Sequence, residues 1–172
     1  MVARLLYDPS RGDLYLASAC DRIVADEDAT FGALGLRAEK RYLGRALDAV
    51  GVRIDRASIG AYKSAYREFS VDSMPQADRE ATERALDVQQ RMLVDALVQG
   101  RHRDASVVTT VLDGRAWSAQ DVLAAGLVDT LGGREEALRL LGSLTGLGPR
   151  PRAVSPAAMR PARRDWTVPA RI

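Results

Sequence analysis

The first part of the chain alternates short apolar runs with a segment of helical spacing. Residues 2–7 (VARLLY) and 22–26 (RIVAD) read as short strands, and residues 13–21 (DLYLASACD) between them read as a buried helix. A turn punctuated by glycines follows at 29–36. Strands that alternate with helices are typical of proteins with a parallel sheet. The pattern therefore predicts an α/β fold.

The middle of the chain predicts a helix, a strand, a loop and a long helix. Residues 38–51 place apolar side chains on one helical face and end at a glycine. Residues 52–59 (VRIDRASI) alternate between apolar and polar, which indicates a strand. Residues 60–74 lack a long periodic pattern and read as a loop, and a helix then runs from Pro75 to about Gln99. Loops at strand ends are common active-site positions in α/β folds.

The last part predicts shorter elements and then a change in composition. The expected elements are helices at 105–112, 118–125 and 135–144, and a strand at 127–131. Five of the seven prolines fall after Leu147, which is typical of a linker. We therefore expect a domain over residues 1–145 and a Pro/Arg-rich linker over residues 146–172.

Composition narrows the classes of function. The chain has 172 residues, of which 47% are hydrophobic and 28% charged, as expected for a globular protein. No apolar run approaches the ~18 residues of a membrane span. One cysteine (Cys20) and one histidine (His102) offer too few ligands for a metal cluster, so we expect no metal or cofactor. Arginines crowd the last part of the chain, but no aromatic stacking set or DNA-binding motif accompanies them, so we expect no nucleic-acid partner.

Lysine is rare in this chain, and that makes one lysine a candidate base. Only Lys40 and Lys63 are lysines among the 25 basic residues. A buried lysine can lose its proton near neutral pH, whereas arginine stays charged. Lys63 lies in the loop after a predicted strand, but it needs a nucleophile, most simply a serine. The candidates are Ser10, Ser18, Ser58, Ser64 and Ser70, and spacing alone selects none of them. Two of these have structural explanations as well, because Ser10 could cap the first helix and Ser18 could bond to it.

Four stretches carry a resemblance to a known family. In chain order they read YLASACDRIVA, FGALGL, VRIDRASIGAYKSAYREFSVDSMPQADRE and DGRAWSAQDVLAAGLVDTLGG, within about residues 4–140. Together they resemble the signal peptide peptidase A family, also called protease IV. The resemblance implies an α/β fold of the ClpP/crotonase-like spiral type, of which this chain holds a partial domain. It also implies a membrane-associated serine endopeptidase, working as a homo-oligomer, whose Ser-Lys dyad degrades the remnants of cleaved signal peptides.

The family's site residues carry over unevenly. The catalytic lysine of the family follows a Gly-x-x-Lys pattern, which Gly60-Ala61-Tyr62-Lys63 matches, so Lys63 is the implied base. The nucleophilic serine opens a Ser-Gly-Gly-Tyr-Tyr pattern, and that position holds Arg11 here. Ser10 lies one residue early, which turns its side chain by roughly 100° on a helix. A further serine, in a Thr-Gly-Ser-x-Gly turn that orients the lysine, is replaced by Ala33.

The long form of the family accounts for this uneven match. It has two tandem repeats, of which the first supplies the lysine and the second supplies the serine. The resemblance therefore implies that this chain is the lysine-bearing first half, cut at both ends, and that its partner is the second repeat of the same polypeptide. Two alternatives stay open: a non-catalytic structural or oligomerisation module of the same fold, and a crotonase-type acyl-CoA enzyme.

Overall fold

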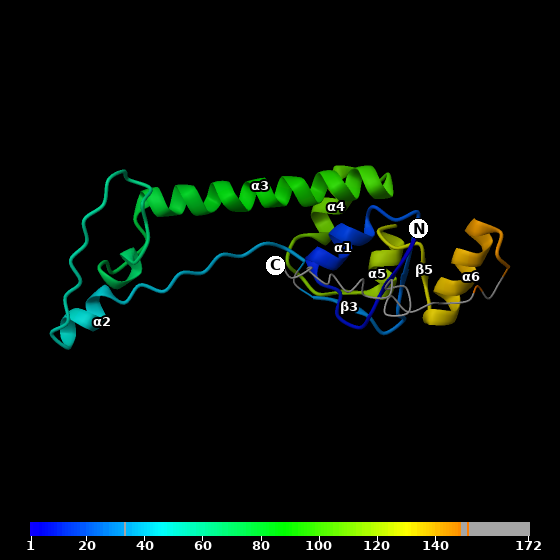
Figure 1. Ribbon diagram of the computed structural model, residues 1–172, viewed down its shortest axis with the longest axis horizontal. Helices are drawn as coiled ribbons and strands as arrows, with labels where there is room; N and C mark the ends of the chain where they lie inside the picture. The colour runs from blue at the N-terminus through cyan, green and yellow to red at the C-terminus, as the bar shows by residue number, and fades with distance from the viewer. Residues whose placement is uncertain (33, 149–150, 152–172) are drawn as a thin grey trace, which may run out of the picture.

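The computed structural model describes residues 1–32, 34–148 and 151. Its helices and strands lie in two regions, a core and an arm that projects from it (Figure 1). The elements of the core, in chain order, are β1 (Val2–Leu5), α1 (Arg11–Ala17), β2 (Arg22–Ala25), β3 (Thr30–Phe31), α4 (Ala105–Val111), β4 (Trp117–Ser118), α5 (Ala119–Ala124), β5 (Thr130–Leu131) and α6 (Arg134–Thr145). The arm holds α2 (Gly44–Ala49) and the 3₁₀ helix η1 (Arg67–Phe69), and α3 (Gln76–Arg101) joins the two regions.

The core is built on a parallel sheet in the order β1-β2-β5. Val2 pairs with Arg22 and Leu5 with Ala25, and α1 forms the crossover between these two strands. A short antiparallel pair, β3 with β4, lies beside the sheet. This arrangement confirms the predicted α/β class with a parallel sheet.

The side chains of the core are apolar and fully enclosed. The largest of them are Leu14, Ile23, Phe31, Leu34, Leu97 and Leu127. They come from α1, β2, β3 and the turn after it, α3 and the segment that precedes β5, so elements far apart in the sequence share one hydrophobic cluster. Burial of this apolar surface supplies the main driving force for folding of the core.

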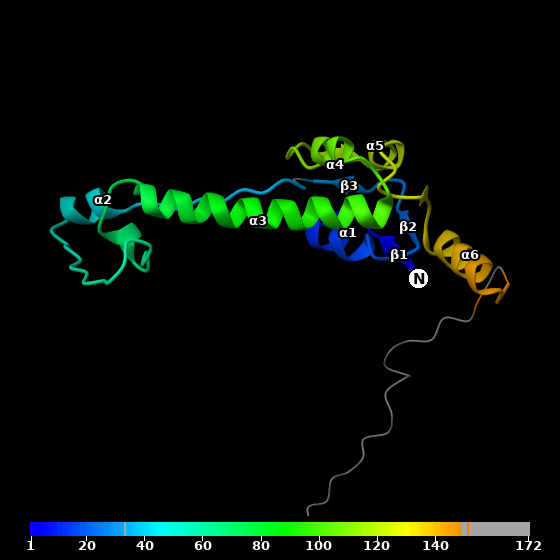
Figure 2. The same ribbon diagram turned by 90° about the horizontal axis from the view of Figure 1, so that it is seen from above.

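The arm comprises residues 38–84, all of which the structure describes. Helix α3 has 26 residues and is therefore about 39 Å long. Its C-terminal half packs on the core through Leu93 and Leu97, while its N-terminal half extends beyond the core towards the end of the molecule where α2 and η1 lie (Figure 2). Gly44 lies against the chain at Val71 so closely that a Cβ at Gly44 would come within 2.6 Å of the Val71 carbonyl oxygen. The two sides of the arm therefore meet through backbone rather than through apolar side chains.

Two predictions for the arm are wrong. Only residues 44–49 of the expected 38–51 helix are helical, and residues 52–59 form no strand. The apolar positions fall into two pairs, 52/54 and 57/59, that a strand would place on opposite faces, because Asp55-Arg56 breaks the period. Ile59 is 100% exposed, and within the described chain no other strand lies beside this segment. Alternation predicts which side chains share a face, whereas a strand also needs a neighbour for its backbone hydrogen bonds.

The remaining differences concern short strands, element ends and the last residues. Strand β3 lies within the turn predicted at 29–36, and the strand predicted at 127–131 is limited to Thr130–Leu131. The first helix covers 11–17 rather than 13–21, and α3 continues two residues past Gln99. Most of the predicted linker at 146–172 lies outside the described residues. Among the helices that the structure describes, none combines the length and apolarity that a bilayer crossing requires.

Candidate functional site

The position that the family pattern assigns to the nucleophile opens helix α1. Arg11 is the first residue of this helix, and its Nη1 donates to the carbonyl oxygen of Gly35 at 3.4 Å. Gly35 closes the turn that corresponds to Thr-Gly-Ser-x-Gly in the family, so this turn and the helix start lie side by side. Ala33, the third position of the turn, lies outside the described residues. The helix start that the resemblance compares with the family's nucleophile thus presents a guanidinium.

Ser10 is a helix cap, as one reading of the sequence predicted. Its Oγ donates to Asp13 Oδ2 at 2.6 Å and accepts from the Asp13 backbone N–H at 3.2 Å. Asp13 returns the contact by accepting from the Ser10 backbone N–H, which completes a capping box. The hydrogen bonds from the Ser10 side chain and backbone lower the pKa of Asp13. The hydroxyl of Ser10 is thus committed to the helix.

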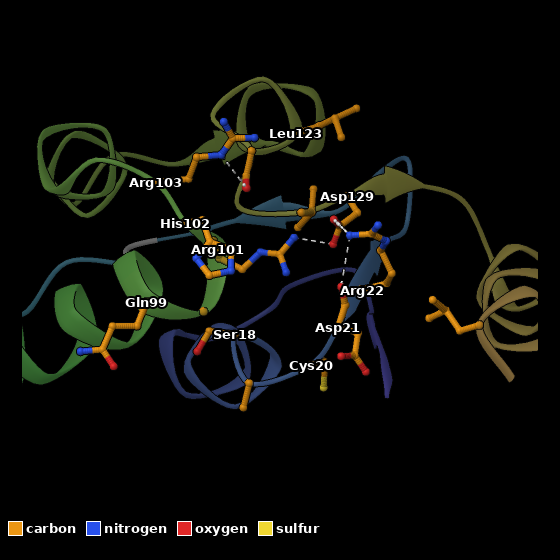
Figure 3. Close-up of a pocket in the computed structure, with 15 residues that line it drawn as sticks. Ser18, Cys20, Asp21, Arg22, Gln99, Arg101, His102, Arg103, Leu123 and Asp129 are labelled. Atoms are coloured by element: carbon orange, nitrogen blue, oxygen red, sulfur yellow. Dashed lines mark hydrogen bonds and ion pairs between the residues drawn. The ribbon is translucent and has the colours of Figure 1, made fainter.

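A cavity of about 830 Å³ lies at the opposite end of α3 from the arm (Figure 3). Asp129 is its central charge: it pairs with Arg101 and with Arg22, and it accepts from the Ile23 backbone N–H at 2.7 Å. The carboxylate thereby satisfies the amide at the start of β2. This cluster ties the start of the central strand β2 to the residue that precedes β5 and to the end of α3.

Three side chains of this cavity are of types that act as nucleophiles or proton carriers in enzymes, namely Ser18, Cys20 and His102. Ser18 Oγ donates to the Tyr15 carbonyl oxygen at 2.6 Å, which confirms that this buried serine bonds to its own helix. His102 ends α3 in the left-handed conformation, as its predicted place at a helix end suggests. Cys20 is half-buried rather than fully buried. Within the described residues, no group of three or more His, Cys, Asp or Glu side chains could hold a metal ion.

Lys63 lies in the arm, in a turn that its motif explains. Its backbone N–H donates to the Gly60 carbonyl oxygen at 3.3 Å, and Gly60 has a φ of 94°. Glycine adopts this conformation without the steric cost that a side chain would add. The Gly-x-x-Lys pattern therefore describes one turn, closed between its first and last residues.

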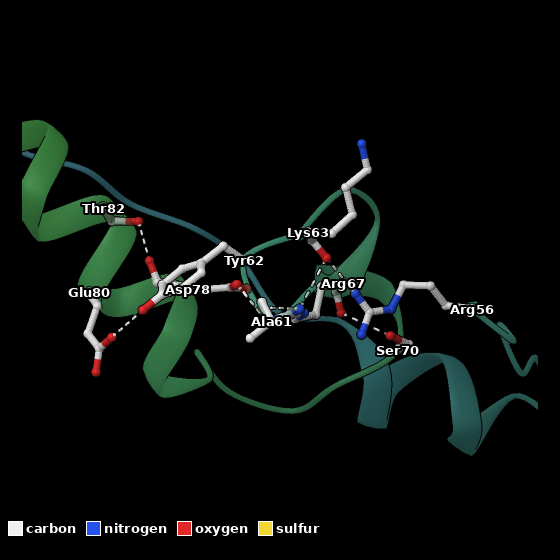
Figure 4. Close-up of polar contacts among 9 residues, drawn as sticks. All are labelled: Arg56, Ala61, Tyr62, Lys63, Arg67, Ser70, Asp78, Glu80 and Thr82. Atoms are coloured by element: carbon white, nitrogen blue, oxygen red, sulfur yellow. Dashed lines mark hydrogen bonds and ion pairs between the residues drawn. The ribbon is translucent and has the colours of Figure 1, made fainter. Parts of the chain in front are cut away.

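The backbone of this turn is held by a buried ion pair (Figure 4). Arg67 Nη1 donates to Asp78 Oδ1 at 2.7 Å, while Arg67 Nη2 donates to the carbonyl oxygens of Ala61 at 2.9 Å and Lys63 at 3.1 Å. The side chains of Arg67 and Asp78 are 8% and 2% exposed. They are the only two buried residues of the arm, residues 38–84. Burial raises the pKa of nearby Tyr42, and the negative charges of Asp78 and Glu68 add to the rise.

The side chain of Lys63 points away from this ion pair and into solvent (Figure 4). Within the part of the chain that the structure describes, no hydrogen bond or ion pair reaches its Nζ. The other serines do not supply a partner: Ser70 Oγ donates to the Arg67 carbonyl oxygen at 3.2 Å, and Ser58 and Ser64 make no bond with Nζ. The ammonium group is therefore open to a group from outside these residues.

Lys63 and Arg11 lie at different points along α3. Arg11 lines a shallow pocket with Gln89 and Met92, whereas the Lys63 turn is fixed to Asp78 in the first turn of the same helix. Asp78 and Gln89 are 11 positions apart in the sequence, which corresponds to about 16 Å along a helix axis. The structure thus separates the predicted base from the position that the family gives to the nucleophile.

Comparison with known proteins identifies the family. The sequence profile of Peptidase family S49 matches residues 6–148. The chain therefore belongs to Peptidase family S49, which confirms the resemblance to signal peptide peptidases at the level of the family.

Several named relatives agree with this assignment. A protein of Synechocystis sp. that carries the provisional name of a protease is 30% identical over 138 residues, which make up 80% of this chain and 49% of that protein. A provisionally named signal peptide peptidase SppA of Enterococcus faecium is 26% identical, over 74% of this chain and 36% of that protein. The chloroplastic serine protease SPPA of Arabidopsis thaliana is 23% identical, over 75% and 19%. The chain thus spans about half or less of the length of these relatives.

One solved structure overlaps with most of the chain. It belongs to an enoyl-CoA hydratase/isomerase family protein from Hyphomonas neptunium, with 18% identity and a TM-score of 0.36 over 84% of this chain and 36% of that one. At this TM-score the likeness carries no argument about activity.

Proposed function

We propose that this chain is the lysine-bearing part of a serine endopeptidase with a Ser-Lys dyad. The observation that carries the proposal is that the Lys63 side chain is exposed and that, among the described residues, nothing bonds to its Nζ. It projects from a turn that the buried Arg67–Asp78 ion pair holds, and this ion pair is called the clamp below. At the position that the resemblance compares with the family's nucleophilic serine, this chain has Arg11. The serine would come from a second repeat of the same polypeptide, with residues 1–145 as a partial domain and 146–172 as the linker between the repeats.

In this proposal Lys63 acts as a general base. Its neutral amine takes the proton from the serine Oγ as that oxygen attacks the peptide carbonyl, and the resulting ammonium donates a proton to the leaving amine. An exposed amine in water favours the protonated form, so the partner must also cover Lys63. Burial disfavours the charged form of an amine and thereby prepares it to accept a proton.

The substrates would be peptides, and the family resemblance points to signal peptide remnants. Such substrates lie in or at the membrane, so the complete protein would be membrane-associated and would work as a homo-oligomer. No cofactor takes part in this chemistry, because the dyad supplies both the nucleophile and the proton acceptor.

The first experiment compares two lysine variants of the complete protein. Lys63→Arg keeps the positive charge but removes the titratable amine, so peptide hydrolysis should fall by about 10²–10⁴-fold. Lys40→Arg is the matched control, because Lys40 is the other lysine of the chain and is also exposed. Hydrolysis by Lys63→Arg at the wild-type rate would refute the assignment.

A second candidate function is a non-catalytic oligomerisation module. The exposed apolar side chains of the arm favour it: Val50 is 73% exposed and Tyr66 71%. A partner that covers these side chains would serve a structural module as well as an enzyme. In this case the complete protein would assemble normally, and both lysine variants would leave peptide hydrolysis unaffected.

A further inference from the structure

We propose that Arg67 is a positioning residue for Lys63, acting through the backbone on both sides of Tyr62. This inference rests on the proposed function, because it assumes that Lys63 is the base. Arg67 touches no reacting atom. Its role would be to fix the turn from which the lysine side chain projects.

The geometry of the contacts supports this role. Arg67 Nη2 lies between two carbonyl oxygens, 2.9 Å from that of Ala61 and 3.1 Å from that of Lys63. Both bonds are to backbone, so they set the orientation of the peptide group between Ala61 and Tyr62 and of the one that follows Lys63. A guanidinium presents several donors in a rigid plane, whereas an ammonium is a compact charge that lacks this fork. Arginine is therefore suited to hold two carbonyls and a carboxylate together.

The burial of the pair argues against a role in stability alone. Removing two charges from water is costly, and well-packed apolar residues of the same volume often stabilise a protein as well or better. Arg67 and Asp78 are nevertheless the buried residues of an arm that encloses no apolar side chain. In this setting the buried charged pair fixes one conformation of the turn, and it does not add to a hydrophobic core.

Asp78 ties the turn to a rigid element. It lies in the first turn of α3, and Tyr62 adds a second link by donating through its hydroxyl to Glu80 Oε2 at 3.0 Å. Helix α3 reaches the core at Leu93 and Leu97. The Lys63 turn is thus attached to the core through the helix, and a partner that docks on the core would meet Lys63 at a fixed distance.

Arg56 provides a matched control within the same turn. Its Nη1 donates to the same Lys63 carbonyl oxygen at 3.0 Å, but Arg56 is exposed and has no contact with Asp78. Exposed polar contacts of this kind contribute little, because water replaces them readily. Loss of Arg56 should therefore disturb the turn much less than loss of Arg67.

The test uses the complete protein and measures kcat and KM for a peptide substrate together with thermal unfolding. The key variant is the double substitution Arg67→Met with Asp78→Leu, which replaces the buried pair by apolar side chains and should keep the fold. We expect kcat to fall by about 10- to 100-fold, since a displacement of about 1 Å in a catalytic group has this effect. KM should stay within about twofold and the unfolding temperature within about 2 °C of wild type, because neither binding nor folding is targeted.

Three further variants complete the design. Arg67→Lys keeps the charge opposite Asp78 but loses the fork, and should also lower kcat by about tenfold. Arg56→Met should lower kcat by less than about threefold. If the double variant folds and its kcat stays within about twofold of wild type, the positioning role is refuted. Lys63→Arg distinguishes a failure of the positioning role from a failure of the proposed function. If Lys63→Arg is fully active, Lys63 is not the base, and Arg67 then has no base to position.

Discussion

The core and the arm of this chain bury different kinds of side chain. The core encloses apolar residues such as Leu14, Ile23 and Phe31, which come from separate elements and share one cluster. The arm encloses a single ion pair, Arg67 with Asp78, and leaves its apolar side chains half-buried or exposed. The core therefore carries the stability of the fold, whereas the arm carries a defined turn and the exposed lysine of the family motif.

This difference between the core and the arm indicates which region is suited to bind a partner. A region without an apolar core keeps its shape through a few specific polar contacts, and its exposed apolar side chains are available to a partner. The arm has both features, and Lys63 projects from it. If the two regions differ in this way, substitutions in the core should lower the free energy of unfolding. Substitutions of Arg67 or Asp78 should instead alter the conformation of the Lys63 turn.

The largest expected effect on stability belongs to the core. Phe31 is fully buried, so Phe31→Ala should lower the free energy of unfolding by about 3–5 kcal/mol. Ile59→Ala is the matched arm variant, and because Ile59 is fully exposed its effect should stay within about 0.5 kcal/mol. Denaturant unfolding followed by circular dichroism measures both. Equal losses for the two variants would show that the arm has a core of its own.

An effect of similar size, but confined to the arm, is expected when the Arg67–Asp78 pair loses one partner. Asp78→Ala leaves the Arg67 guanidinium buried without its carboxylate, and breaking a buried pair in this way costs about 3–5 kcal/mol. The arm should open locally rather than unfold the whole chain, since the core does not depend on it. Hydrogen exchange should therefore accelerate at residues 60–70 and stay slow in β1 and β2. Equal acceleration in the sheet would contradict the separation of the two regions.

The smallest effect concerns Ser10, which distinguishes a helix cap from a nucleophile. Ser10→Ala should destabilise the protein by about 1 kcal/mol, as loss of an N-cap does, and leave peptide hydrolysis by the complete protein intact. The Ser10 hydrogen bonds lower the pKa of Asp13, so their contribution is present above the ordinary aspartate pKa and is lost as pH falls through the lowered value. The stability difference between wild type and Ser10→Ala should therefore shrink in acid, below about pH 4. Loss of hydrolysis in this variant would make Ser10 the nucleophile.

The sequence predicted the core better than the arm, for a physical reason. Strands β1 and β2, helix α1 and the capped helix α5 follow from local periodicity and cap residues, because each element buries one face against the others. The segment at 52–59 has the periodicity of a strand only in part and forms none, since the chain beside it offers no strand to pair with.

The candidate site could also be predicted only where it depends on neighbouring residues in the sequence. The Gly-x-x-Lys motif located Lys63 and its turn, which depend on four consecutive residues. The Arg67–Asp78 pair was missed, because these residues belong to different elements, η1 and α3, so no periodicity within one helix or strand relates them. The available signal was weak: an arginine four residues after the lysine and an aspartate in the first turn of the next helix.

The central claim is that Lys63 acts as a titratable amine rather than as a charge. Its exposed side chain allows the amine to be removed and rebuilt in the complete protein. Lys63→Cys, made with Cys20→Ser and any other cysteine removed, should be inactive. Alkylation with 2-bromoethylamine creates a lysine analogue that can lose a proton, and alkylation with a bromoethyl trimethylammonium reagent creates a cation that cannot.

The measurement is the rate of peptide hydrolysis after each alkylation. If Lys63 is a titratable base, the amine restores hydrolysis and the permanent cation does not, because only the amine can accept the proton of the serine. Equal recovery with both reagents, or full activity of the cysteine variant before alkylation, would contradict it.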